Sequence, residues 1–135
     1  MKINYKLFLV SKEDIDSICK KYDITNYTIN DDGSIDVNGS VHLSNKELTK
    51  LPLRFGKVSG NFDCSRNNLK TLEGCPKYVG SFFSCCYNNL KTLDGGPETV
   101  LGEYLCHNNK LINFSGFPEY FHRAFCISDN PVSNI

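Results

Sequence analysis

The sequence has no tryptophan, a single methionine and no net charge. Its 15 lysine and arginine residues are balanced by 15 aspartate and glutamate residues when histidine is neutral. A protein that holds a nucleic acid by electrostatics needs an excess of positive charge, and a mimic of DNA needs an excess of negative charge. The balance therefore argues against both classes, and we expect no nucleic-acid partner.

Long apolar runs are also absent. The N-terminal run Leu7-Phe8-Leu9-Val10 is too short for a signal peptide, and no run approaches the roughly 20 residues of a membrane-spanning helix. Seven cysteines are an odd number and fall below the density of a disulfide-linked scaffold. These absences predict one soluble cytoplasmic domain with reduced thiols and no membrane partner.

What the sequence does contain is a repeat of 21 residues. The segment NNLKTLEGCP begins at Asn67, NNLKTLDGGP at Asn88 and NKLINFSGFP at Asn109. Five apolar columns that stay in phase over five units are not a chance pattern. The columns are Val37, Val58, Val79, Val100 and Phe121; Val41, Phe62, Phe83, Tyr104 and Phe125; Leu43, Cys64, Cys85, Cys106 and Ile127; Leu48, Leu69, Leu90, Leu111 and Val132; and Leu51, Leu72, Leu93, Phe114 and Ile135.

A unit of this length is too short to bury its own apolar side chains, so the units must stack and share a continuous core. Within a unit, Phe62 and Cys64 alternate with outward residues, as in a half-buried strand. Gly74 and Pro76 predict a tight return that is too short for a helix. We therefore predict an α+β solenoid with about five coils over residues 37–135, one short strand per coil and a parallel sheet on one face.

Residues 1–36 do not follow the repeat and are predicted to cap its first coil. A capping-box-like start at Ser11 and a helical apolar pattern predict a helix from about Lys12 to Tyr22. The pair Asp32-Gly33 predicts a hairpin of two strands within Tyr27 to Val37. Such a cap would cover the open apolar edge of the first coil. A separate functional domain is the alternative.

The pattern Phe62-x-Cys64-x-x-Asn67-x-Leu69-x-x-Leu72 resembles the leucine-rich repeat, and the resemblance covers roughly residues 37–135. The repeat length and the stretch LSNKELTKLP resemble the short class found in bacterial effector proteins. The repeated motif NNLKTLEGCP is also similar to motifs in uncharacterised bacteriophage repeat proteins. The bacteriophage likeness implies a small cytoplasmic protein that sequesters or inhibits a host factor, such as a defence component.

Two columns of polar or reactive residues invite a chemical interpretation. Cys64 and its column neighbours are predicted to be core, because small thiols pack well there and a single file cannot surround a metal tetrahedrally. Cys86 and His107 lie 21 residues apart in an outward column, where a nucleophile with its base, or half of a metal site, is a hypothesis. No oxyanion-hole motif or third orienting residue accompanies them. We therefore expect no catalytic residue, no metal and no cofactor.

The asparagine column predicts a structural ladder. Its side chains can donate to and accept from the backbone of stacked turns, and the same bonds would repeat from coil to coil. The members are Asn67, Asn88, Asn109 and Asn130.

Alternation along the strands leaves one surface for recognition. Apolar and aromatic side chains inside a polar rim are the composition of a protein-binding hot spot. A solvated sheet with scattered apolar residues is the alternative. The predicted protein-binding residues are Asp63, Arg66, Phe82, Tyr87, Glu103, Leu105 and His107.

The last coil has no polar cap after it in the sequence, which predicts either a tail that folds over itself or a homodimer through this coil. The residues predicted for self-association are Phe121, Phe125, Ile127, Val132 and Ile135. We thus predict a non-catalytic protein-binding module. A self-assembling or virion-associated structural protein is the alternative, and an enzyme with a Cys86 and His107 site is the third hypothesis.

Overall fold

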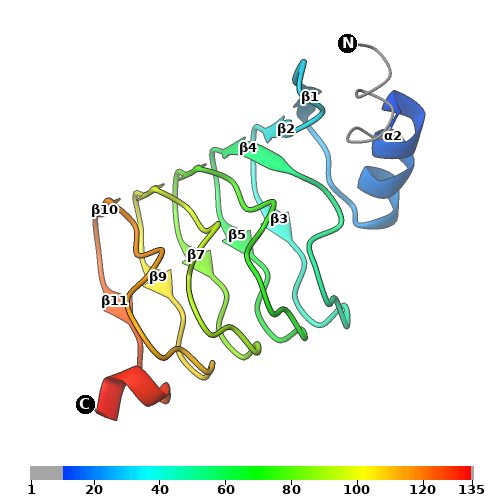
Figure 1. Cartoon of the computed structure of the whole chain (residues 1–135). Coiled ribbons are helices and arrows are strands. Elements are labelled where there is room, and N and C mark those ends of the chain that lie inside the picture. Colours follow the sequence, from blue (N-terminus) through cyan, green and yellow to red (C-terminus); the bar gives the residue numbers. More distant parts are fainter. Residues whose placement is uncertain (1–10, 135) are drawn as a thin grey trace.

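The computed structural model describes residues 11–134 and shows a solenoid with parallel sheets, which confirms the predicted fold class (Figure 1). Strand pairs recur along the stack, and four full turns lead from the first pair, β2 and β3, to the last, β10 and β11. The elements are α2 (Lys12–Lys21), β1 (Tyr27–Ile29), β2 (Ile35–Val37), β3 (Val41–His42), β4 (Phe55–Val58), β5 (Phe62–Asp63), β6 (Tyr78–Val79), β7 (Phe83–Ser84), β8 (Thr99–Val100), β9 (Tyr104–Leu105), β10 (Tyr120–Phe121), β11 (Phe125–Cys126) and the 3-10 helix η1 (Pro131–Asn134).

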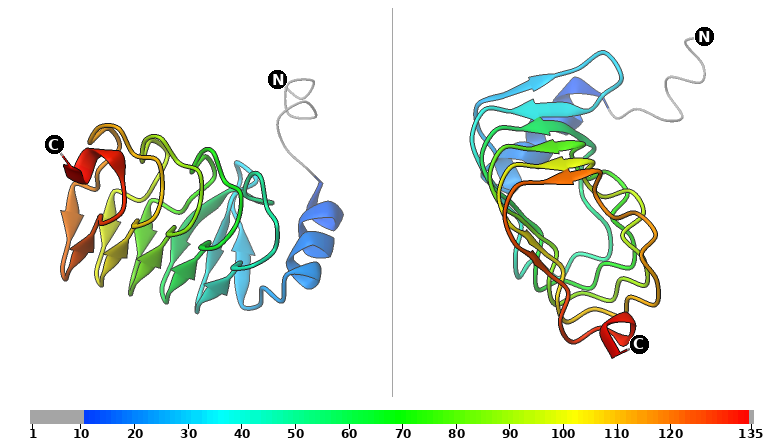
Figure 2. Two further views of the ribbon diagram at one scale, coloured as in Figure 1. Left: turned by 90° about the horizontal axis from the view of Figure 1, so that it is seen from below. Right: turned by 90° about the vertical axis from the view of Figure 1, so that its left-hand side faces the viewer.

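Each turn contributes two short strands, so the stack carries two sheets where the sequence predicted one. One sheet has the order β1-β2-β4-β6-β8-β10 and the other the order β11-β9-β7-β5-β3. Every pairing is parallel except that of β1 with β2. The chain bends between the two sheets in each coil, as the view along the stack shows (Figure 2). The additional strands were missed because most are two residues long, which is too short for alternation to be visible.

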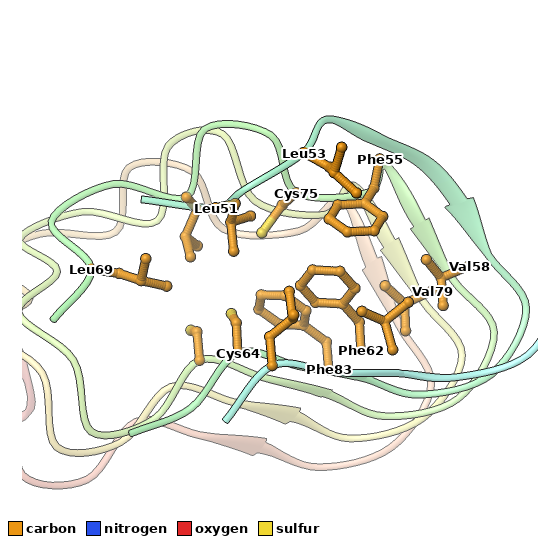
Figure 3. Close-up of a cluster of buried hydrophobic side chains, with 14 of the residues drawn as sticks. Leu51, Leu53, Phe55, Val58, Phe62, Cys64, Leu69, Cys75, Val79 and Phe83 are labelled. Carbon is orange, nitrogen blue, oxygen red and sulfur yellow. The ribbon is translucent and has the colours of Figure 1, made fainter. Parts of the chain in front are cut away.

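The strand register confirms the 21-residue step. Val58 pairs with Val79, and Phe62 pairs with Phe83, which in turn pairs with Tyr104. The aromatic rings of this column lie over one another, with centroids 6.0 Å apart for Phe62 and Phe83 and 4.8 Å apart for Phe83 and Tyr104. All three are fully buried, and side chains from successive coils fill the interior together (Figure 3). The core is therefore a continuous file along the stack.

Two predicted core positions are exposed, Phe114 and Phe121, and the latter is 40% exposed although the other members of its column are buried. Phe114 continues the column of Leu51, Leu72 and Leu93, which are buried, yet its side chain is 59% exposed. No residue of the described range follows Phe114 in this column to cover its side chain. The ring instead packs edge-on against Phe117, with the two centroids 4.8 Å apart.

The end of the stack next to the first coil carries the helix and the hairpin that the sequence predicts. The Ser11 hydroxyl accepts a hydrogen bond from the Asp14 amide at 3.1 Å and starts α2, whose Ile15 and Cys19 are buried in the common core. Strand β2 then pairs with both β1 and β4, so the hairpin continues into the six-stranded sheet. Among the described residues, no helix is both long and apolar enough to cross a membrane.

The predicted asparagine ladder is confirmed. Asn88 Oδ1 accepts the Leu69 amide at 2.9 Å, and its Nδ2 donates to the carbonyls of Cys64 at 3.1 Å and Cys85 at 3.0 Å. Each asparagine thereby ties its own coil to the preceding one, and it does so in a turn that is closed to solvent. Equivalent bonds occur at Asn67, Asn109 and Asn130.

Candidate protein-binding surface

The predicted recognition residues lie along the five-stranded sheet and in the turn that follows each of its strands. Three side chains, those of Arg66, Tyr87 and Glu103, are exposed. The other four, those of Asp63, Phe82, Leu105 and His107, are half-buried between neighbouring coils. Arg66, Tyr87 and Glu103 are thus more accessible than Phe82 and Leu105, the two apolar residues at the centre of the predicted surface.

The structure brings Arg66, Tyr87 and His107 together from three successive coils. The guanidinium carbon of Arg66 lies 4.2 Å from the centroid of the Tyr87 ring. The His107 ring meets the same tyrosine edge-on, with centroids 5.6 Å apart and planes at 84°. A cation over one ring and an aromatic edge beside it both restrict the orientation of the ring. Tyr87 is therefore a fixed side chain that still exposes 41% of its surface.

The backbone at this surface is unusual. The residue at the turn after each strand of the five-stranded sheet has a positive φ, 55° at Arg66 and 58° at Tyr87. The equivalent positions hold Asn45, Asn108 and Asp129, which are residue types that tolerate this conformation. Arginine and tyrosine adopt it at a cost of about 1 kcal/mol each. These two positions therefore carry strain that an asparagine would relieve.

A shallow hollow of about 410 Å³ borders Tyr87. Its walls include Asn68, Asn89 and Asn108, whose side-chain amides make no hydrogen bond within the described part of the chain. Lys110 adds a cation to the same hollow. An aromatic side chain beside unused amide donors and acceptors can contact both the side chains and the backbone of a peptide.

The structure places Cys86 and His107 on the same surface in different surroundings. Cys86 is 8% exposed, and its thiol lies 3.2 Å from the Ser84 hydroxyl. The His107 ring packs on Tyr87, and its Nδ1 is buried without a hydrogen-bond partner among residues 11–134. Within that same range, no group of three His, Cys, Asp or Glu side chains could hold a metal ion. An enzyme site at Cys86 and His107 stays a hypothesis from the sequence.

The cysteine column lies in the core. Burial raises the pKa of Cys85 well above its ordinary value and raises that of Cys106 to about 12. Both thiols therefore remain protonated at neutral pH and behave as small apolar groups. Cys75 is also buried, although its position in a turn did not suggest this.

At the opposite end of the stack from α2, the structure shows an aromatic cluster that was only partly predicted. Phe117 lies between Phe114 and Phe125, with ring centroids at 4.8 Å and 4.6 Å, and Phe121 lies 5.2 Å from Phe125. Phe117 was missed because Gly96 occupies its position one coil earlier. The high density of phenylalanine after residue 113 was the signal that could have found it. Of the other residues predicted for self-association, Ile127 is half-buried, Val132 is buried, and Ile135 lies outside the described residues.

Comparisons with known proteins do not assign a family. No model of a known protein family matches the chain, and no curated protein or solved structure matches it either. The likeness to leucine-rich repeats and to bacteriophage repeat proteins therefore stays a prediction from the sequence.

Proposed function

We propose that this protein is a non-catalytic binding module that recognises another protein with the surface around Arg66, Tyr87 and His107. The observation that carries the proposal is the left-handed backbone at Arg66 and Tyr87. Three other coils place asparagine or aspartate at this position, so the fold itself does not require a large side chain there. Strained residues persist at binding sites when the strain positions a functional group.

The chemistry of the surface suits a protein ligand. Tyrosine and arginine are the residue types that most often supply binding energy at protein interfaces. The tyrosine ring is already held by its neighbours, so little conformational entropy is lost when a partner covers it. Amides beside it supply hydrogen bonds to the partner, and the acidic residues Asp63 and Glu103 on the same sheet favour a partner with basic groups opposite them.

The bacteriophage likeness extends the proposal to the biological setting. On that likeness, the protein acts in the host cytoplasm and sequesters or inhibits a host protein, such as a defence component. The likeness alone supports this part of the proposal.

The test is an affinity capture with paired variants. Immobilised wild-type protein, Arg66→Asn and Tyr87→Asn are each incubated with a lysate of the host cell, and bound proteins are identified by mass spectrometry. We expect each variant to lose the captured partner while its thermal unfolding temperature stays equal to or above that of the wild type. Lys77 is an exposed cation directly before strand β6 of the other sheet, so Lys77→Asn is the matched control and should retain the partner. A partner that is retained by both Arg66→Asn and Tyr87→Asn would contradict the proposal.

A further inference from the structure

Among residues 11–134, strand β10 is the last strand of the six-stranded sheet, and none of these residues pairs with its outer edge. The two residues beside Phe121 already point their amides toward the preceding coil, since Tyr120 N–H donates to the Glu98 carbonyl at 3.1 Å and His122 N–H donates to the Val100 carbonyl at 3.0 Å. Backbone groups alternate in direction along a strand. The N–H and C=O of Phe121 therefore both point away from the stack, where another strand can pair with them.

The same edge is apolar. Tyr120 is 48% exposed, Phe121 is 40% exposed and Phe114 is 59% exposed, and these are the most exposed large aromatic side chains of the last coil. The opposite end of the stack differs, because there α2 buries Ile15 and Cys19 and covers the first coil. An open strand edge that also carries exposed aromatic residues is a template for pairing with a further strand.

The sequence of this edge is complementary to itself in charge. Glu119 and Arg123 lie two residues before and two residues after Phe121, and both are exposed. We propose that a second copy of this chain covers the edge, with β10 of the two copies paired antiparallel about a two-fold axis at Phe121. Strand β10 covers Tyr120 and Phe121 alone, and the chain bends just outside it, where the Arg123 N–H donates to the Gly102 carbonyl at 3.3 Å. In this arrangement the long side chain of Glu119 of each copy therefore lies near the long side chain of Arg123 of the other, across the axis.

Antiparallel symmetry also satisfies the backbone. At the axis the two Phe121 residues exchange both of their N–H to C=O hydrogen bonds, which is the closely paired position of an antiparallel ladder. The aromatic residues of each last coil then lie against those of the other copy, and the two six-stranded sheets become one. A partner of unrelated sequence would need its own matching acid and base at this spacing, whereas a second copy supplies them by symmetry.

This inference is separate from the proposed function. The surface around Tyr87 lies on the other sheet, so the dimer would present two recognition surfaces to its partners. Arg66→Asn and Tyr87→Asn are therefore expected to leave self-association unchanged, and either proposal can fail without the other.

The test is sedimentation velocity over a wide range of protein concentration, with charge-reversal variants. The wild type should change from the mass of one chain to that of two chains as the concentration rises. Glu119→Arg and Arg123→Glu should each weaken the dimer about tenfold or more, because both cross-strand pairs become repulsive. The double variant should recover the wild-type dissociation constant, and an equal mixture of the two single variants should form a heterodimer.

The matched control is Glu98→Arg, which reverses the charge at the position equivalent to Glu119 one coil earlier, away from the open edge. It should leave the dissociation constant unchanged. A wild type that is a single chain at every concentration would overturn the proposal and indicate that another segment or protein covers the edge. A dimer that tolerates both single reversals, or that the double variant fails to restore, would overturn it as well.

Discussion

Replacing Asn88 with alanine tests whether the asparagine ladder holds the coils together. Asn88 is 7% exposed, and its side-chain amide joins the coil that contains it to the preceding coil, in addition to the backbone bonds between the strands. Alanine removes the acceptor of the buried Leu69 N–H and the donor to the Cys64 and Cys85 carbonyls. The amide of Leu69 then has no side chain to receive its hydrogen bond.

The expected loss follows from how these groups share partners. The Cys64 carbonyl also accepts from Asn67, and the Cys85 carbonyl also accepts from Asn109, so each retains one donor in the variant. Only the Leu69 N–H loses its hydrogen-bond acceptor, which lowers the free energy of unfolding by about 1–3 kcal/mol. The loss of one donor at each of the two carbonyls lowers it by about 0.5–1 kcal/mol more per carbonyl. We expect Asn88→Ala to reduce the free energy of unfolding by about 3 kcal/mol.

The assay is urea unfolding followed by circular dichroism. Asn89→Ala is the matched control, because the neighbouring side chain makes no hydrogen bond within residues 11–134, and it should change stability by less than about 0.5 kcal/mol. If Asn88→Ala matched Asn89→Ala, the ladder would not be a source of stability and the reasoning above would be refuted.

Three further predictions concern single groups in the cap and the core. The pKa of Asp16 is lowered chiefly by a hydrogen bond from Tyr27 and then by Lys12. The stabilisation from the Tyr27 bond is therefore fully present above the unfolded pKa of about 3.9, and it is lost as the pH falls through the lower pKa of the folded state. Urea unfolding should therefore find Tyr27→Phe less stable than the wild type near about pH 7, with a smaller difference in strong acid; a difference of the same size at both pH values would contradict this. Tyr104 buries a hydroxyl that has no partner among the described residues, so Tyr104→Phe should raise the free energy of unfolding by about 1 kcal/mol, and a loss of stability would show that the hydroxyl is satisfied. A Cβ at Gly80 would lie 2.1 Å from a backbone carbonyl oxygen of the preceding coil, so Gly80→Ala should lower the thermal unfolding temperature severely, and a wild-type temperature would refute the close approach.

The stacking of the coils was predictable because it depends on spacing alone. Once Phe62, Phe83 and Tyr104 share a column, their pairing in register follows, and so does the asparagine ladder. The second sheet was not predictable in the same way, since its strands are too short to alternate. Gly80 was not predicted either, because only the structure shows that the preceding coil leaves no room for a side chain there.

The sequence predicted which residues lie at the candidate site better than it predicted how their side chains are arranged. Alternation placed Tyr87 and His107 on one surface, yet it gave no indication that Arg66 would lie over the tyrosine ring. The left-handed turn had a visible signal, namely asparagine or aspartate at 45, 108 and 129 in the same column. An exposed apolar face at the last coil was foreseen from the sequence, but the exposure of Phe114 was not, because a column position is buried only when the next coil covers it.

The cysteine file gives this protein a set of internal chemical probes. Cys64, Cys85 and Cys106 sit at the same depth in three successive coils, and each is fully buried. A thiol reagent can reach one of them only when its own coil opens, whereas the partly exposed Cys126 should react first. The rate at which each native thiol is modified therefore measures the opening of that coil, and a single reaction followed by peptide mapping would show whether the solenoid frays from one end or opens as a unit.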